Sequence, residues 1–119
     1  MADQQNHIPG KITYLVSVDE SDDCRVAMRM AALRARNTGG QVVLLYVIEP
    51  ASFQHWGAVS EVMAEERRQE AEERLQTLAA EVHDYADIRP VLFVEEGSKL
   101  EQILKLIDNE PDIHAMVLG

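Results

Sequence analysis

The sequence predicts a parallel, doubly wound α/β domain, a single sheet with helices on both faces. Four short runs rich in β-branched and aromatic residues alternate with three longer segments of helical periodicity, in the order β-α-β-α-β-α-β. One of these runs, residues 42–48, is continuously apolar, which is typical of a parallel strand covered on both faces. A length of 119 residues fits one core, and 46% hydrophobic with 27% charged residues is ordinary globular composition.

The first unit is a strand over residues 11–18 (KITYLVSV), which stops at an acidic cluster and leads into a helix over residues 21–38. Gly39 and Gly40 supply the helix end. Small and apolar residues recur at spacings of three and four, which predicts one close-packed helix face. The residues of this face are Cys24, Ala27, Met28, Ala31 and Ala35.

The second unit is a strand over residues 41–48 followed, after a loop, by a long helix that extends to about residue 84. The outer face of this helix is strongly charged and is interpreted as a solvated surface or as a contact for a partner helix. Glu70 and Arg74 have the spacing of a favourable ion pair. The predicted inner face comprises Ala71, Leu75, Leu78, Ala79 and Val82.

The third unit is a strand over residues 88–94, a helix and a last strand over residues 113–118. Pro90 cannot donate to a strand ladder, so the third strand is expected at a sheet edge or to have Pro90 at its start. Ser98 and Glu101 have the spacing of a capping box that opens the third helix. The predicted inner face of that helix comprises Ile103, Leu104 and Ile107.

The charge balance argues against two classes of partner. Eleven Lys and Arg residues against 21 Asp and Glu residues give a formal net charge of −10 at pH 7. A field of that sign repels phosphate backbones and anionic lipid, so we expect no nucleic-acid partner and no membrane partner. A small anionic ligand is still allowed, because backbone amides at a helix N-terminus outweigh distant charge within one cleft.

Cysteine content and hydropathy set the expected compartment and boundaries. Cys24 is the only cysteine, which excludes an intramolecular disulfide and fits a reducing, cytoplasmic compartment. The longest apolar run, residues 42–48, is far shorter than the roughly 20 residues of a membrane-spanning helix. Residues 1–10 are polar and are interpreted as a flexible N-terminal tail, and residues 11–119 as a single domain.

Candidate ligand contacts are the residues that follow each strand. In open parallel sheets the ligand crevice lies beyond the carboxyl ends of the strands, where the strand order reverses. The residues at these positions are Asp19, Ser21, Glu49, Glu95, Glu96, Gly97 and Gly119.

The acidic cluster at residues 19–23 has three interpretations. Carboxylates at a helix N-terminus complement the helix dipole by about 0.3 to 1 kcal/mol each, so capping alone accounts for it. Alternatively Asp19, the first residue after a buried strand, accepts hydrogen bonds from a ligand. A magnesium pocket of a phosphoacceptor domain would need an Asp at the end of the third strand, where the sequence has Glu95 and Glu96.

No catalytic constellation and no metal site is predicted. Cys24 lies on the inner helix face and is interpreted as a small core residue rather than a nucleophile. The four histidines have no spacing of three or four residues between them that would indicate metal ligands. Glycine-rich motifs of the forms GxGxxG and GxxxxGK[ST] do not occur. Phe53, His55 and Trp56 cover either the core edge or a pocket.

Three segments together resemble the universal stress protein family, over essentially residues 11–119. They are YLVSVDESDDCRVAMRMAALRA at 14–35, GGQVVLLYVIEP at 39–50 and EEGSKLEQILKLIDNEPDIHAMVLG at 95–119. The Val18-Asp19-x-Ser21 turn is one of the matching marks. Tyr46 departs from the pattern, because the family often has a histidine there.

The resemblance implies a Rossmann-like sheet of order 3-2-1-4-5 between two helical layers, with strand 3 at an edge. In nucleotide-binding members, the Asp after the first strand and backbone near a Val of the second strand contact adenosine. A G-x2-G-x9-G-[ST] loop after the fourth strand holds the phosphates. The matching positions in this sequence are Asp19, Val47, Leu118 and Gly119, with Ser17 and Ser21 as weaker neighbours.

Gly119 would be the first glycine of that phosphate loop, and the sequence ends there. The remaining glycines, the following helix and the fifth strand are absent from it, so we expect the given sequence to be a fragment. Since backbone amides of the loop supply phosphate affinity, ATP with Mg²⁺ is expected to bind a full-length form, and nothing is expected to bind tightly to residues 1–119 alone.

The leading functional hypothesis is a cytoplasmic universal stress protein that acts as an ATP-responsive binding module in the stress response. The alternative is a stress protein that does not bind nucleotide and works through dimerisation or protein docking. The resemblance implies a homodimer, although family dimers often use the fifth strand. Turnover is limited to slow ATP hydrolysis at most, because no water-positioning group is identified near the phosphates.

Overall fold

A computed structural model describes residues 12–49, 60–110 and 113–117, and it contains the four strands and three helices in the predicted order. The first strand begins two residues later than predicted and the third ends two residues later. The strands are β1 (Thr13–Val18), β2 (Gln41–Ile48), β3 (Val91–Glu96) and β4 (Ile113–Val117); the helices are α1 (Asp23–Thr38), α2 (Ser60–Ala86) and α3 (Lys99–Asn109).

The strands form one sheet of order β3-β2-β1-β4, and every pair in it is parallel. Among the described strands β3 lies at an edge, and Pro90 immediately precedes it, as the sequence predicts. The strand order reverses at β1. From β1 the chain adds β2 and then β3 on one side, whereas β4 pairs with the other side of β1. The α/β fold class and the 3-2-1-4 part of the strand order are confirmed.

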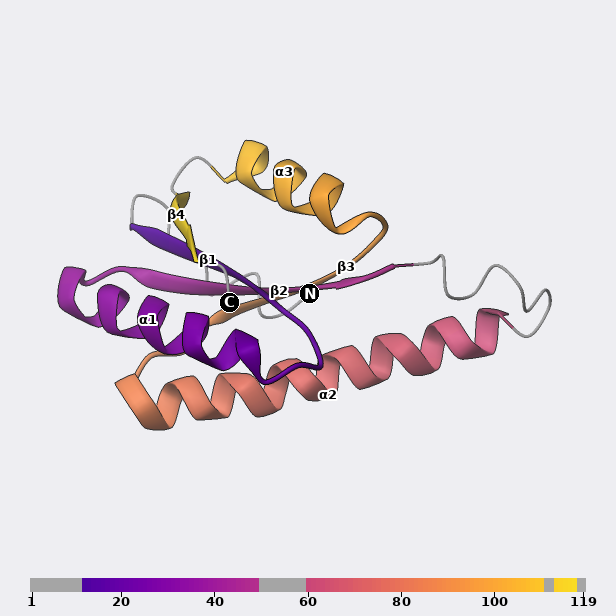
Figure 1. The fold of residues 1–119 in the computed structure, drawn as a ribbon, viewed down its shortest axis with the longest axis horizontal. Coiled ribbons are helices and arrows are strands. Elements are labelled where there is room, and N and C mark those ends of the chain that lie inside the picture. Colours follow the sequence, from indigo (N-terminus) through magenta and orange to yellow (C-terminus); the bar gives the residue numbers. More distant parts are fainter. Residues whose placement is uncertain (1–11, 50–59, 111–112, 118–119) are drawn as a thin grey trace.

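The helices divide between the two faces of the sheet (Figure 1). Helices α1 and α2 lie together on one face, and α3 crosses the other. The core splits in the same way. Beneath α1 and α2 it includes Tyr14, Val16, Val42, Leu44, Leu75 and Leu78; beneath α3 it includes Leu15, Val43, Leu45, Val91, Phe93 and Ile103.

The predicted inner face of α1 is confirmed: all five of its residues are buried, and Ala32 is buried beside them. Side chains this small let the helix axis approach the sheet and α2 closely, because few atoms separate the backbones. The helix ends at Gly39, whose φ of 71° places it in the left-handed region that glycine adopts without strain.

Three local predictions are wrong. Leu104 is 52% exposed rather than on the inner face of α3, which consists of Ile103 with Leu106 and Ile107 packed against it. Ser98 is the N-cap of α3, but its side chain makes no capping hydrogen bond. Arg74 does not pair with Glu70; it binds backbone carbonyl oxygens of the loop between β1 and α1.

Candidate functional site

The sequence-predicted positions Ser17, Asp19, Ser21 and Val47 lie at the carboxyl end of the β1–β2 pair. Ser17 is paired with Leu45 in the parallel register, and Val47 follows two residues later on β2. Asp19 directly follows β1. This edge lies beside the place where the strand order reverses, which is where ligands bind in open α/β sheets.

Asp19 closes a tight turn on Ser21. Its Oδ1 accepts one hydrogen bond from the Ser21 backbone N–H at 2.8 Å and another from the Ser21 hydroxyl at 2.6 Å. Both residues are exposed. The turn therefore fixes one carboxylate oxygen of Asp19 and presents the carboxyl group at the sheet edge.

The electrostatics of the turn keep Asp19 ionised. The hydrogen bond from the Ser21 side chain is the main cause that lowers the pKa of Asp19 below its ordinary value, against a smaller opposing effect of burial. The Ser21 backbone N–H and the positive charges of Lys99 and Arg74 also lower it. Lys99 begins α3, so charges from both helical layers act on this one carboxylate.

Ser17 and Val47 are on the α3 side of the sheet. Leu15 and Leu45 belong to the core beneath α3, and residues two apart on a strand share a face. Val47 is partly buried and packs against that core. The Ser17 Oγ is buried and has no hydrogen-bond partner among the described residues. A buried hydroxyl without a partner costs about 1 to 3 kcal/mol, so it is an unusual feature of a folded protein.

Two residues that the sequence analysis did not place at the site hold the loop that carries Asp19. Arg74 of α2 donates to the backbone oxygens of Asp19 and Ser21, at 3.1 Å each. The hydroxyl of Tyr46 on β2 donates to Glu20 Oε1 at 2.8 Å. Burial, with a contribution from Glu20, raises the pKa of Tyr46 to about 12, so the phenol remains a donor at neutral pH.

An ion-pair cluster ties the start of α1 to α2. Arg25 donates to both carboxylate oxygens of Glu81, at 2.8 and 3.0 Å, and it also pairs with Asp22. The guanidinium group of Arg25 lowers the pKa of Glu81. Asp22 is the N-cap of α1, but its side chain binds Arg25 instead of the helix N-terminus. Capping therefore does not explain this member of the acidic cluster.

The other chemically interesting residues lie apart from this edge or outside the described residues. Cys24 is buried in the core, as predicted, with its Sγ 3.3 Å from the Ser21 oxygen. His83 lies near the end of α2, 3.5 Å from Asp87. Within the described residues no group of three or more His, Cys, Asp or Glu side chains is arranged to hold a metal ion. The predicted contacts Leu118 and Gly119, and the loop with Phe53, His55 and Trp56, lie outside the described residues.

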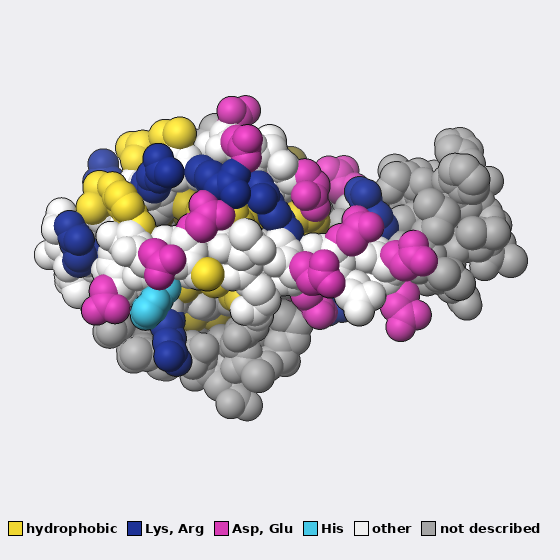
Figure 2. Space-filling model, turned by 90° about the horizontal axis from the view of Figure 1, so that it is seen from below, with side chains coloured by type: hydrophobic (Ala, Val, Ile, Leu, Met, Phe, Trp, Pro, Cys, Tyr) yellow, Lys and Arg dark blue, Asp and Glu magenta, His cyan; other side chains and the backbone are white. Residues whose placement is uncertain are grey.

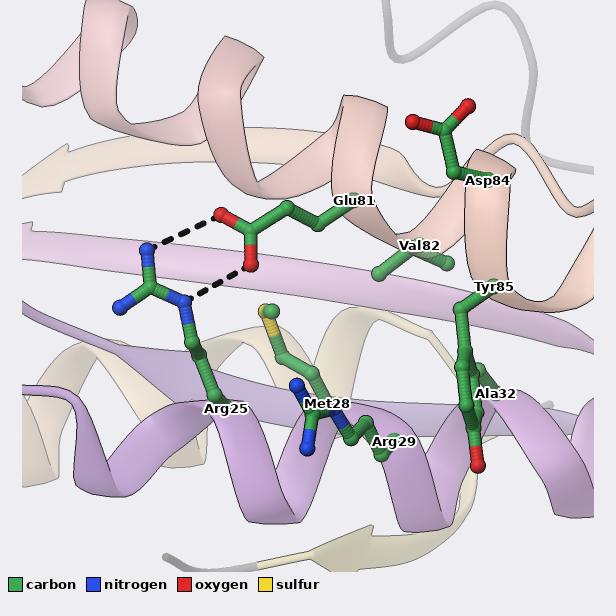
Figure 3. A pocket seen from close by; sticks show the side chains of 8 residues that line it. All are labelled: Arg25, Met28, Arg29, Ala32, Glu81, Val82, Asp84 and Tyr85. Atoms are coloured by element: carbon green, nitrogen blue, oxygen red, sulfur yellow. Dashed lines mark hydrogen bonds and ion pairs between the residues drawn. The ribbon is translucent and has the colours of Figure 1, made fainter.

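A groove of about 280 Å³ runs between α1 and α2 (Figure 3). The Arg25–Glu81 pair lies at one end of the groove. At the other end Arg29 lies over the Tyr85 ring, with its Cζ 5.9 Å from the ring centre. Figure 2 shows hydrophobic and basic side chains side by side where the two helices lie together, and acidic side chains predominating toward the opposite end. The exposed large hydrophobic residues on these two helices are Val26, Met30 and Tyr85.

None of the described helices is long and apolar enough to cross a membrane.

Comparison with known families gives a match that covers nearly all of the described structure. The model of the universal stress protein family matches residues 13–119. No curated protein sequence matches the chain.

Solved structures with the same fold include several universal stress proteins. One from Lactobacillus plantarum has a TM-score of 0.76 at 22% identity, over 95% of this chain and 79% of that one. One from Burkholderia pseudomallei has a TM-score of 0.75 at 19% identity, over 92% and 81%. A universal stress protein in complex with cAMP has a TM-score of 0.53 at 16% identity, over 83% and 65%. At these identities the likeness establishes the fold.

Proposed function

Because the chain belongs to the universal stress protein family, we propose that it is a cytoplasmic, nucleotide-responsive binding module of the stress response. The proposed ligand is an adenosine nucleotide, ATP with Mg²⁺ in a full-length form. The adenosine contacts are Asp19 and the backbone near Val47, with Ser17 and Ser21 as neighbours. Leu118 and Gly119 are proposed to continue the site toward the phosphates.

The observation that carries the proposal is the buried hydroxyl of Ser17, which no described residue hydrogen-bonds. Most buried polar groups in native proteins have a hydrogen-bond partner, because the loss of hydration is otherwise not compensated. Ser17 lies two residues before Asp19 and on the same sheet face as Val47. A ligand with nitrogen atoms in a flat aromatic ring, as in adenine, would give the hydroxyl a partner and pack against Val47.

The turn at Asp19 supports the same ligand. Both hydrogen bonds from Ser21 end on Oδ1, so Oδ2 is the oxygen proposed to accept from a ribose hydroxyl or an adenine amino group. The lowered pKa of Asp19 keeps it an acceptor at neutral pH. An anionic carboxylate here would not bind phosphate, so we propose that the phosphates extend away from Asp19 toward residues 118–119.

A similar protein lends independent support, since a universal stress protein of the same fold was solved in complex with cAMP. Adenosine and a phosphate group are common to cAMP and ATP. We therefore propose adenosine recognition as the shared element, with the phosphate contacts determining which nucleotide binds.

Calorimetric titration of the longest available form with ATP and Mg²⁺ tests the proposal. We expect heat of binding and a rise in melting temperature, because a ligand that binds only the folded state stabilises it. Absence of both would contradict nucleotide binding. Asp19→Ala should weaken binding about tenfold or more, the usual effect of losing a hydrogen bond to a charged group.

Asp23→Ala is the matched control for that variant. It removes one carboxylate four residues along the same acidic cluster, from an exposed position in the first turn of α1. Equal effects of the two variants would indicate that only the net charge of the cluster matters. An unchanged affinity in Asp19→Ala would make Asp19 a turn residue without ligand contact.

A second candidate function is protein docking or homodimerisation without nucleotide. The exposed surface of α1 and α2 favours it, because Val26 and Met30 of α1 and Tyr85 of α2 are large hydrophobic residues that lie open to solvent. Sedimentation of the wild type and of Met30→Asp, each with and without ATP, separates the two functions. Association that Met30→Asp abolishes, in a protein that ATP does not stabilise, would favour docking over nucleotide binding.

A further inference from the structure

The loop of residues 19–22, which joins β1 to α1, is held by side chains from two distant parts of the chain. Arg74 is 55 positions along the sequence from Asp19, and Tyr46 is 26 positions from Glu20. The loop itself is exposed at all four residues. An exposed loop of this length would ordinarily be mobile, since it has few buried contacts to order it.

Arg74 makes the more specific of these contacts. Its Nε donates to the backbone carbonyl oxygen of Asp19 and its Nη2 to the backbone carbonyl oxygen of Ser21, both at 3.1 Å. These two carbonyl groups flank the turn in which Asp19 Oδ1 binds Ser21. A planar guanidinium with two parallel donors fixes the relative orientation of two acceptors, which a single ammonium group does not.

The position of Arg74 on α2 explains why it reaches the loop. It lies three residues after Ala71 and four before Leu78, two fully buried residues of the inner face. Arg74 is therefore at the boundary of the buried stripe and is itself partly buried. Arg67, seven residues or about two turns earlier, is exposed and contacts Glu70 at 3.9 Å.

We propose that Arg74 is a positioning residue for the ligand contact at Asp19. It holds the two backbone carbonyl groups around the turn, and this pre-orders the Asp19 carboxylate before a nucleotide arrives. Binding then avoids the entropy cost of ordering the loop, which raises the affinity. The inference rests on the proposed nucleotide-binding function but concerns a residue of the opposite sheet face, with no ligand contact of its own.

Amide hydrogen exchange without ligand tests the positioning directly. In Arg74→Ala we expect the Ser21 amide to exchange about tenfold faster than in the wild type, because the carbonyl groups that flank its turn lose charged donors. Arg67→Ala removes the same charge from the same helix and should leave this amide unchanged. Equal exchange in the two variants would overturn the proposal.

Arg74→Lys separates positioning from charge and also covers the case in which Arg74→Ala does not fold. It retains the positive charge but not the two-pronged donor. We expect exchange at Ser21 to be faster than in the wild type and AMP affinity to fall severalfold. Wild-type exchange and wild-type affinity in Arg74→Lys would mean that only charge matters, which overturns the proposal.

AMP affinity, measured by calorimetry on the same proteins, links the loop to the ligand. Arg74→Ala should weaken AMP binding about tenfold, while Arg67→Ala should not. Faster exchange with unchanged affinity would reduce Arg74 to a structural residue and overturn the proposal. A wild-type protein that binds no AMP would instead contradict the proposed function, and the exchange rates would still decide whether Arg74 holds the turn.

Discussion

The two faces of the sheet are covered very differently. Beneath α1 and α2, 20 described residues form one buried cluster, to which the strands and both helices contribute. Beneath α3 the buried cluster has six members among the residues that the structure describes, with a further set of partly buried residues against it. The α3 face also carries the unpartnered hydroxyl of Ser17, and α3 exposes Leu100 and Leu104.

In the proposed function the two faces have different tasks. The face under α1 and α2 contains most of the buried hydrophobic residues among those described and, through Arg74 and Tyr46, holds the loop that carries Asp19. The α3 face combines less burial with an unsatisfied polar group next to the carboxyl end of β1. A binding site needs unsatisfied groups that a ligand completes, and the stability of the opposite face offsets their cost.

The largest expected effect is a loss of stability on the sheet face covered by α1 and α2. Leu75→Ala removes a side chain that is 1% exposed and should lower the free energy of unfolding by about 2 to 5 kcal/mol, through lost burial and a cavity. Urea denaturation measures this change. Leu104→Ala on α3, at 52% exposure, is the matched control and should cost about 1 kcal/mol or less. Similar losses in the two variants would remove the distinction between the faces.

The second effect tests whether the α3 face binds the nucleotide. Ser17→Ala removes the orphan hydroxyl and should raise the free energy of unfolding of the ligand-free protein by about 1 kcal/mol. Nucleotide should stabilise the variant less than the wild type. A thermal denaturation series with and without ATP measures both quantities. Loss of stability in the ligand-free variant would show that the hydroxyl has a partner in solution.

A smaller effect concerns the ion pair between the two helices of the well-covered face. Arg25 lowers the pKa of Glu81 in the folded state. The stability that the ion pair contributes is therefore present above the ordinary Glu pKa and is lost as pH falls through the folded-state pKa. Glu81→Gln should cost about 1 kcal/mol or less near pH 7, because both side chains are partly exposed. Its stability should also decline less steeply on acidification. Parallel pH profiles of variant and wild type would contradict this assignment.

The smallest effect at neutral pH concerns Tyr46. Its folded-state pKa is raised to about 12, so its contribution to stability is present below the ordinary Tyr pKa of about 10 and is lost as pH rises toward 12. Tyr46→Phe should therefore flatten the loss of stability between these pH values. Circular dichroism melts at alkaline pH measure the difference. An unchanged alkaline profile would mean that Tyr46 ionises as freely in the folded state as in the unfolded chain.

The fold could be predicted because its signals are local. Hydrophobic periodicity and the glycines that end α1 are properties of neighbouring residues in the sequence. The bounds of β2, Gln41–Ile48, are those predicted. Leu104 was misplaced because the apolar face of α3 is wider than the part that meets the sheet, and Leu104 lies with Leu100 along its exposed margin. Spacing alone does not tell which of its leucines meets the sheet.

The site could be predicted only in part, because its supporting contacts are non-local. Asp19 follows from its position after a strand, and Ser17 and Val47 come from the resemblance to the universal stress protein family, but the donors to the loop come from α2 and β2. Arg74 has the spacing of a partner for Glu70, and this local reading was wrong. Its position between Ala71 and Leu78, on the edge of the buried stripe, is the signal that indicates an inward-directed arginine.

NMR mapping of AMP, titrated to millimolar concentration into the 119-residue chain, tests adenosine binding at the sheet edge most directly. It reports weak binding residue by residue, so it does not depend on tight phosphate contacts. We expect the largest amide shifts at Ser17, Asp19 and Val47, with little change at Arg29 and Tyr85 in the groove between α1 and α2. Shifts confined to that groove, or none at the sheet edge, would contradict adenosine binding beside Asp19.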